Sequence, residues 1–199
     1  MATVLVPAAR WPRWVANFGE RHGGAELAVA DGALTGRAQD GSTFRAALPF
    51  GLEHTGDPDG FAEAAAAPED WGVLLVRKGG FAVARMRGTD MVEHKIGQRH
   101  VQGRTKAGGQ SQQRFARRRD NQARQAYEAA AGHAARLLTG VPLLVVGGDH
   151  SAVDAVVPEA GLTDASVVEP WLPVPDPKRA ILDQAIHDAG SIRVEVVNA

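Results

Sequence analysis

The chain has 199 residues, of which 44% are hydrophobic and 23% are charged, so it is long enough to bury a substantial core. It contains no cysteine, which excludes disulfide scaffolds, cysteine-ligated metal centres and thiol nucleophiles. No apolar run approaches the ~20 residues that a bilayer-spanning helix needs, and the first residues lack the basic segment of a secretory signal. We therefore expect a soluble, cytoplasmic protein that does not bind membranes.

The first fifty residues predict a small unit of their own. Four large apolar residues recur at helical spacing, namely Trp11, Trp14, Val15 and Phe18. Gly23-Gly24 can end this helix. Three short strand patterns follow, at 26–30, 33–38 and 43–48, with Asp-Gly pairs between them that signal hairpins. We expect a helix on a β-meander in residues 1–50, with the tryptophans packed in its core.

Residues 71–199 predict a second, larger domain, which residues 51–70 connect to the first as a linker rich in turn signals and alanine. Three strand patterns, at 72–76, 81–87 and 91–101, precede a long helix over about 111–138. Further strands near 141–146, 166–169 and 192–197 alternate with helices that begin at Ser151 and at Pro177, the second with Asp176 as its N-cap. This order predicts an α+β fold, a mixed sheet with helices packed on it.

The basic residues concentrate in one segment. Between Lys95 and Arg124, nine basic residues accompany one acidic residue, a net charge of +8, whereas the rest of the chain sums to −9. This asymmetry favours a local site for a polyanion on an otherwise acidic body. A solvated helix face is the alternative interpretation of such a run.

The predicted long helix has two unlike faces. One face carries basic and polar residues: Arg114, Arg117, Arg118, Asn121 and Arg124. The other carries apolar ones: Phe115, Ala123, Ala126, Tyr127, Ala130, Ala134, Leu137 and Leu138. We expect the apolar face to pack on the sheet and the arginine face to point outwards, where guanidinium groups suit successive nucleic-acid phosphates. Arg119 falls on the apolar side and is interpreted as structural.

A polar stretch precedes this helix and ends in Gly108-Gly109-Gln110. Two consecutive glycines let the main chain approach a ligand closely. Glutamine is no useful acid or base, but its backbone N–H can donate to an oxyanion and its amide can hold a water molecule. Alone, such a triplet is usually only a loop. Between a cationic loop and an arginine-rich helix, it is a more specific signal of positional and electrostatic catalysis.

The loop and helix share a compound motif: Gly108-Gly109-Gln110-Ser111, two further residues, then Arg114-Phe115-Ala116-Arg117 and Arg119. This motif resembles the catalytic middle domain of eukaryotic and archaeal class-1 translation release factors, and the resemblance extends over about Trp71 to Val197. The first fifty residues carry no codon-reading motif. The chain is more similar to the release-factor-like peptidyl-tRNA hydrolase family of ribosome quality control, particularly its actinobacterial branch. Known relatives often carry a serine where this chain keeps Gly109.

The resemblance implies codon-independent hydrolysis of the ester between nascent peptide and tRNA, on stalled or split large ribosomal subunits. It implies Gly108, Gly109 and Gln110 as the catalytic residues, and no cofactor or metal ion. It also implies contacts to ribosomal RNA or peptidyl-tRNA from a basic set: Arg104, Lys106, Arg114, Arg117, Arg118 and Arg124. Two alternatives stay open, namely cleavage of the 3′ end of tRNA and a non-catalytic RNA-binding module.

The other chemically notable residues receive structural interpretations. His94 and His100 share one face of a predicted strand and are interpreted as surface or core histidines. The turn at 147–151 lacks the lysine and spacing of a phosphate-binding loop, so it is interpreted as a turn with an N-cap. We expect Trp171 to cover a sheet edge.

Overall fold

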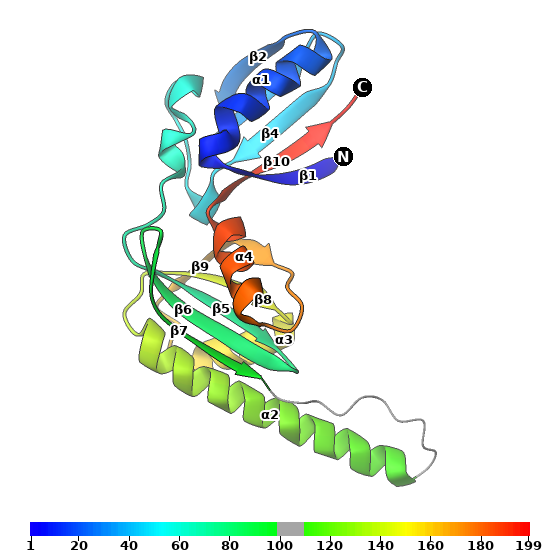
Figure 1. The fold of residues 1–199 in the computed structure, drawn as a ribbon, viewed down its shortest axis with the longest axis vertical. Coiled ribbons are helices and arrows are strands. Elements are labelled where there is room, and N and C mark those ends of the chain that lie inside the picture. Colours follow the sequence, from blue (N-terminus) through cyan, green and yellow to red (C-terminus); the bar gives the residue numbers. More distant parts are fainter. Residues whose placement is uncertain (99–109) are drawn as a thin grey trace. The chain divides into compact units, whose positions relative to one another are not determined.

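The computed structural model describes the backbone of residues 1–98 and 110–199, and the side chains of residues 1–98 and 124–199. The chain divides into two compact units. The first comprises residues 1–68 together with 186–199, and the second comprises residues 69–185. Each unit is built around its own five-stranded sheet (Figure 1).

The first unit is an antiparallel sheet with one long helix. In sheet order its strands are β1 (Ala2–Pro7), β10 (Ser191–Val197), β4 (Thr43–Ala47), β3 (Ala33–Ala38) and β2 (Ala25–Ala30). The helix α1 (Trp11–His22) ends at Gly23, whose φ of 79° is the left-handed conformation that glycine adopts without strain. Trp11, Phe18 and Phe44 are buried together in its core. The helix, its end and the meander agree with the sequence-based prediction.

Two segments differ from the division into 1–50, 51–70 and 71–199. The last strand, β10, lies between β1 and β4 and so completes the sheet of the first unit, where Ile192 and Val194 are fully buried. Residues 51–70 are also more than a linker. They contribute Phe61 and Ala65 to the core of the first unit, and the Phe61 ring lies 5.3 Å from that of Trp11.

The second unit is a mixed sheet covered by helices. In sheet order its strands are β7 (Asp90–Gln98), β6 (Gly80–Arg87), β5 (Trp71–Arg77), β8 (Leu143–Gly148) and β9 (Ser166–Leu172). The strands β5, β6 and β7 pair antiparallel, whereas β8 is parallel to both β5 and β9. The helices α2 (Gln110–Leu138) and α3 (His150–Glu159) pack on one face. The predicted α+β fold with a mixed sheet is confirmed.

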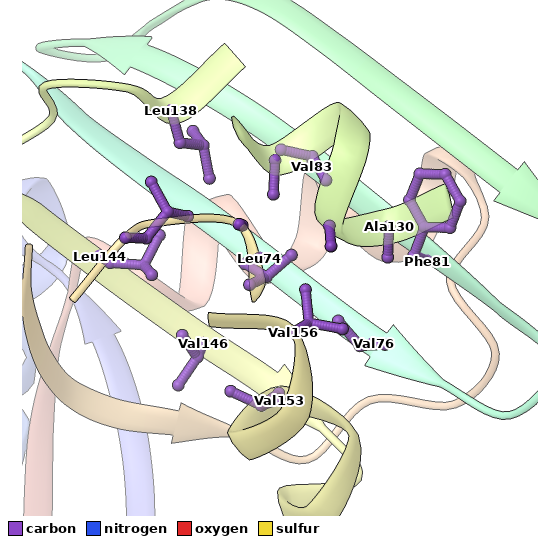
Figure 2. Packing of buried hydrophobic residues seen from close by; sticks show 14 of the residues in the cluster. Leu74, Val76, Phe81, Val83, Ala130, Leu138, Leu144, Val146, Val153 and Val156 are labelled. Atoms are coloured by element: carbon purple, nitrogen blue, oxygen red, sulfur yellow. The ribbon is translucent and has the colours of Figure 1, made fainter. Parts of the chain in front are cut away.

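Apolar residues from both helices and the sheet form the core on this face (Figure 2). The sheet supplies Leu74, Val76, Phe81 and Val83, and Figure 2 shows Ala130 and Leu138 of α2 and Val153 and Val156 of α3 against them. The predicted apolar face of α2 is confirmed where side chains are described, because Ala126, Ala130, Ala134, Leu137 and Leu138 are buried and Tyr127 is half-buried. Phe115 and Ala123 lie outside the described side chains.

The helix α4 (Arg179–Ala189) lies on the opposite face of this sheet. His94 of β7 is the register partner of Ala84, which faces away from Leu74 and Val83. Arg179 Nη1 of α4 lies 3.1 Å from His94 Nε2, which agrees with a structural role for His94. The helix begins at Arg179 and not at Pro177. The N-cap position is therefore Lys178 and not Asp176, whose Oδ1 lies 3.9 Å from Arg77 Nε.

Candidate functional site

The predicted site lies where β7 leads into α2. β7 ends at Gln98 and α2 begins at Gln110, so the glutamine of the Gly-Gly-Gln triplet is the first helical residue. Five residues that the sequence singles out lie outside the described residues: His100, Arg104, Lys106, Gly108 and Gly109. Four more predicted site residues occupy α2 but lie outside the described side chains: Gln110, Arg114, Arg117 and Arg118.

Arg124 is the member of the predicted RNA-binding set whose side chain is described. It is 73% exposed, and its Nε lies 3.7 Å from Glu128 Oε1, one helical turn along. An exposed pair of this kind contributes only about 0.3–0.5 kcal/mol to stability. The guanidinium of Arg124 therefore remains accessible to a stronger anion such as a phosphate.

The helical backbone of α2 is continuous from Gln110 to Leu138, so positions along it can be compared by their phase. The residues buried against the sheet, among them Ala126, Ala130 and Ala134, define one face. At ~100° per residue, the positions of the predicted basic face fall on the opposite side, together with Arg124. The second half of the helix thus has the apolar face that the sequence predicts, and the basic face of its first half stays a prediction.

Arg85 of β6 anchors the end of α2, a role that the sequence pattern does not reveal. Its Nη1 donates to the carbonyl oxygen of Leu137 in the last turn of α2, at 3.4 Å, and to that of Thr139 just beyond the helix, at 3.3 Å. The last carbonyl groups of a helix have no helical N–H partner. Its Nε and Nη2 donate to Asp70 Oδ1 and Oδ2 at 3.0 and 2.7 Å. The hydrogen bonds to Asp70 raise the pKa of Arg85, so the cation at the negative end of the helix dipole stays charged.

Two further contacts hold the second half of α2 to the sheet. Arg136 Nη1 lies 2.7 Å from Glu93 Oε1 of β7. The His133 ring stacks on that of Phe81, with ring centroids 5.5 Å apart. Burial lowers the pKa of His133, and the nearby positive charges of Lys95 and Arg136 lower it further. Burial and these two charges therefore disfavour the protonated ring in the folded protein.

The turn after β8 is structural, as the sequence predicts. Gly148 has a φ of 100°, and a Cβ there would lie 2.2 Å from the carbonyl oxygen of Val76, so a side chain cannot fit. Asp149 is the N-cap residue of α3, but its carboxylate does not cap the helix and instead lies 3.4 Å from Arg77 Nη2. Trp171 stacks on His150 with ring centroids 3.6 Å apart.

A metal site and a membrane-spanning helix place different requirements on the described residues. Within them, no group of His, Asp or Glu side chains is arranged to hold a metal ion. None of the helices in the described part of the chain is both long and apolar enough to cross a bilayer.

The mixed sheet, the long helix after its three antiparallel strands and the Gly-Gly-Gln sequence at the helix start define a release-factor-like class of protein. A comparison with known protein families matches residues 69–195 to the Actinobacteria/chloroflexi VLRF1 release factor family. The chain belongs to this family. The match spans the whole second unit and continues through α4 into β10. No curated protein matches the chain.

Replacing Arg85 with Met tests the anchor of α2. The variant loses the Asp70 pair and the donor to the last carbonyls of the helix, and we expect the free energy of opening of the last turns of α2 to fall by about 1–2 kcal/mol. Amide hydrogen exchange measures this opening locally. The matched control is Arg87→Met, an exposed arginine of the same strand, which should change it by less than ~0.5 kcal/mol. Equal losses in the two variants would contradict the anchor.

The lowered pKa of His133 predicts a pH dependence of stability. Because the folded protein disfavours the charged ring, the unfolded chain binds a proton first as the pH falls below the ordinary value of 6.5. The contribution of His133 to the free energy of unfolding should therefore be complete above pH 6.5 and be lost progressively as the pH falls below it. Urea unfolding, followed at α2 amide resonances, measures the effect. His133→Gln should remove this component, and an unchanged pH profile in that variant would refute it.

Proposed function

We propose that this protein is a codon-independent peptidyl-tRNA hydrolase that releases nascent chains from tRNA on stalled or split large ribosomal subunits. The observation that supports this most strongly is the position of Gln110. It follows two glycines and is the first residue of α2, inside the region that matches a release factor family. Its substrate is the ester that joins the peptide to the terminal ribose of tRNA.

The start of a helix suits the chemistry of ester hydrolysis. The first N–H groups of an α-helix have no helical acceptor, and the helix dipole makes that end positive. As the first helical residue, Gln110 has a backbone N–H of this kind, which can stabilise the oxyanion that develops on the ester carbonyl. Gly108 and Gly109 let the main chain come close enough to the ester.

The side chain of Gln110 acts by position and not by acid–base chemistry. Its amide orients a water molecule towards the carbonyl carbon. The water oxygen bonds to that carbon, and the bond from the carbon to the ribose oxygen breaks. The ribose oxygen leaves as a hydroxyl that carries a proton from the water. Proton transfer through the substrate's own ribose hydroxyl agrees with the absence of His, Asp and Glu from the motif.

Binding to ribosomal RNA and tRNA falls to the basic residues around this site. Arg104 and Lys106 precede the triplet, and one face of α2 carries the positions of Arg114, Arg117, Arg118 and Arg124. Arginines on one face can contact successive phosphates, each contact releasing condensed counterions. The net charge of −9 outside this segment disfavours other orientations of the protein on RNA.

The catalytic role of Gln110 predicts the behaviour of Gln110→Ala. Loss of the amide that positions water should lower peptide release by about 10²–10³-fold, whereas binding to large subunits persists. Release is measured on purified large subunits that carry a labelled peptidyl-tRNA. The matched control is Gln113→Ala, one turn along the same helix, which should release peptide at the wild-type rate. Undiminished release by Gln110→Ala would refute the assignment.

The state of the tRNA in the same assay separates the alternatives. Free peptide with intact tRNA, lost in Gln110→Ala, supports the ester hydrolase. A peptide that still carries terminal nucleotides would instead make the protein a nuclease of the tRNA 3′ end. Tight binding without release by the wild-type protein would make it a non-catalytic RNA-binding module.

Charge reversal tests the basic face of α2. Arg114→Glu combined with Arg117→Glu should weaken binding to large subunits and reduce the salt dependence of log Kd by about 0.7–0.9 for each phosphate that the variant no longer neutralises. Sedimentation across a range of salt concentrations measures both. The control is Arg37→Glu with Arg45→Glu, an equal charge change on exposed residues of the first unit. If both double variants bind alike, the arginine face is only solvated.

A further inference from the structure

The strand β1 forms an open edge of the first sheet. Among the described strands it pairs only with β10, so the backbone N–H and C=O groups of its other edge have no strand partner. Its residues Ala2–Leu5 are exposed and uncharged, with Val4 and Leu5 at 38% and 40%. Proteins usually prevent such an edge from pairing with another strand by charged residues, proline or a covering segment. An unguarded apolar edge is a template for a further strand.

A groove runs along this edge between β1 and α1. Two adjoining hollows form it, and they share Trp14 and Asn17 of α1. One is lined by Ala2 and Val4 of β1 together with Val196 of the paired strand β10 and Asn198, and the other by Leu5, Val6 and Pro7 of β1. The groove therefore follows β1 over its whole length, which suits an extended chain.

The rim of the groove is cationic. Three exposed arginines line the two hollows: Arg10, Arg13 and Arg21. They take part in none of the ion pairs found between described residues. The lining also includes His22, whose Nδ1 lies 2.7 Å from Asp40 Oδ2. Hydrogen bonds lower the pKa of Asp40, mainly the one from the backbone N–H of Ser42 and to a smaller extent the one with His22. Among the described residues no carboxylate lines the groove, so it favours an acidic occupant.

The hollow on the other face of the same sheet has a different character. Residues of both signs line it: Glu26, Arg37, Arg45 and Glu195. These side chains can satisfy one another, as expected for a solvated face. The unbalanced positive charge is thus a property of the groove beside β1 and not of this second hollow.

The aromatic residues of the groove argue against a nucleobase as its occupant. Trp14 stacks on Trp11 with ring centroids 5.3 Å apart and on Phe18 with centroids 5.7 Å apart, at interplanar angles of 11° and 13°. Because its two neighbours in this stack come from the preceding and the following turn of α1, both faces of Trp14 are covered. Single-stranded nucleic acid is bound through free aromatic faces, which Trp14 does not offer.

We propose that the groove between α1 and β1 binds an extended acidic peptide of another protein, which pairs with β1 and adds a strand to the sheet. Backbone hydrogen bonds to β1 supply affinity. Acidic side chains on one side of the peptide meet the three arginines, and apolar ones meet the exposed Val4 and Leu5. A second copy of this chain fits less well, since its own arginine rim would face the first. The surface belongs to the first unit and the proposed hydrolase site to the second, and the inference does not depend on that activity.

The test uses the full-length chain and three labelled peptides, in which valine alternates with glutamate, serine or lysine. We expect the glutamate peptide to bind most tightly and the lysine peptide most weakly, and the perturbed amide resonances to lie in β1 and α1. Arg13→Glu combined with Arg21→Glu should weaken binding of the glutamate peptide by about tenfold or more. The control is Arg37→Glu with Arg45→Glu on the other face, which should leave that binding unchanged.

Each other outcome overturns the proposal. Equal binding of the glutamate and lysine peptides, or none by either, removes the acidic peptide as the occupant. Binding of oligouridylate that is lost in Arg13→Glu/Arg21→Glu assigns the groove to nucleic acid. A dimer that dissociates in sedimentation velocity when Val4 is replaced by Lys assigns the edge to a second copy.

Discussion

The packing of the second half of α2 on the strands β5, β6 and β7 is the constraint on which the rest of the second unit depends. Ala130 and Ala134, both fully buried, keep the helix close to the sheet, and Leu138 fills the end of the interface. Arg85 joins the last carbonyls of the helix to Asp70 at the start of the unit. A helix of 29 residues is about 44 Å long, so this anchor lies far from Gln110.

This arrangement separates the part of the helix that stabilises the fold from the part proposed to act on the substrate. The C-terminal half carries alanines and leucines that pack on the sheet. It also carries charges paired with the sheet, such as Arg136 with Glu93. The N-terminal half, residues 110–124, carries five arginines and one aspartate, a net charge of +4. The backbone N–H groups of its first turn have no helical acceptor, and the helix dipole makes this end positive. One continuous helix thus joins the anchored half to the end that carries Gln110.

Much of the fold could be predicted from the sequence, because local patterns encode helices and hairpins. The limits of α2 were predicted to within one residue, since Leu138 ends an apolar stripe and a glycine pair precedes Gln110. β1 and the place of β10 could not be, because their pairing joins residues almost the whole chain apart. Arg85 resembles a solvent-facing strand residue until the fold brings Leu137 to it. At the site, the compound motif identified the family, whereas the roles of Gln110 and the arginines stay predictions.

The position of Gln110 on the ribosome tests the central claim most directly. Because the chain has no cysteine, Ser111→Cys provides a unique point at which to attach an iron chelate that cleaves nearby RNA. We expect cleavage of large-subunit RNA around the centre where the peptidyl-tRNA ester lies. The same chelate at Glu128→Cys, in the anchored half of α2, should cleave elsewhere. Cleavage confined to other regions of the ribosome when the chelate is at position 111 would contradict the proposed function.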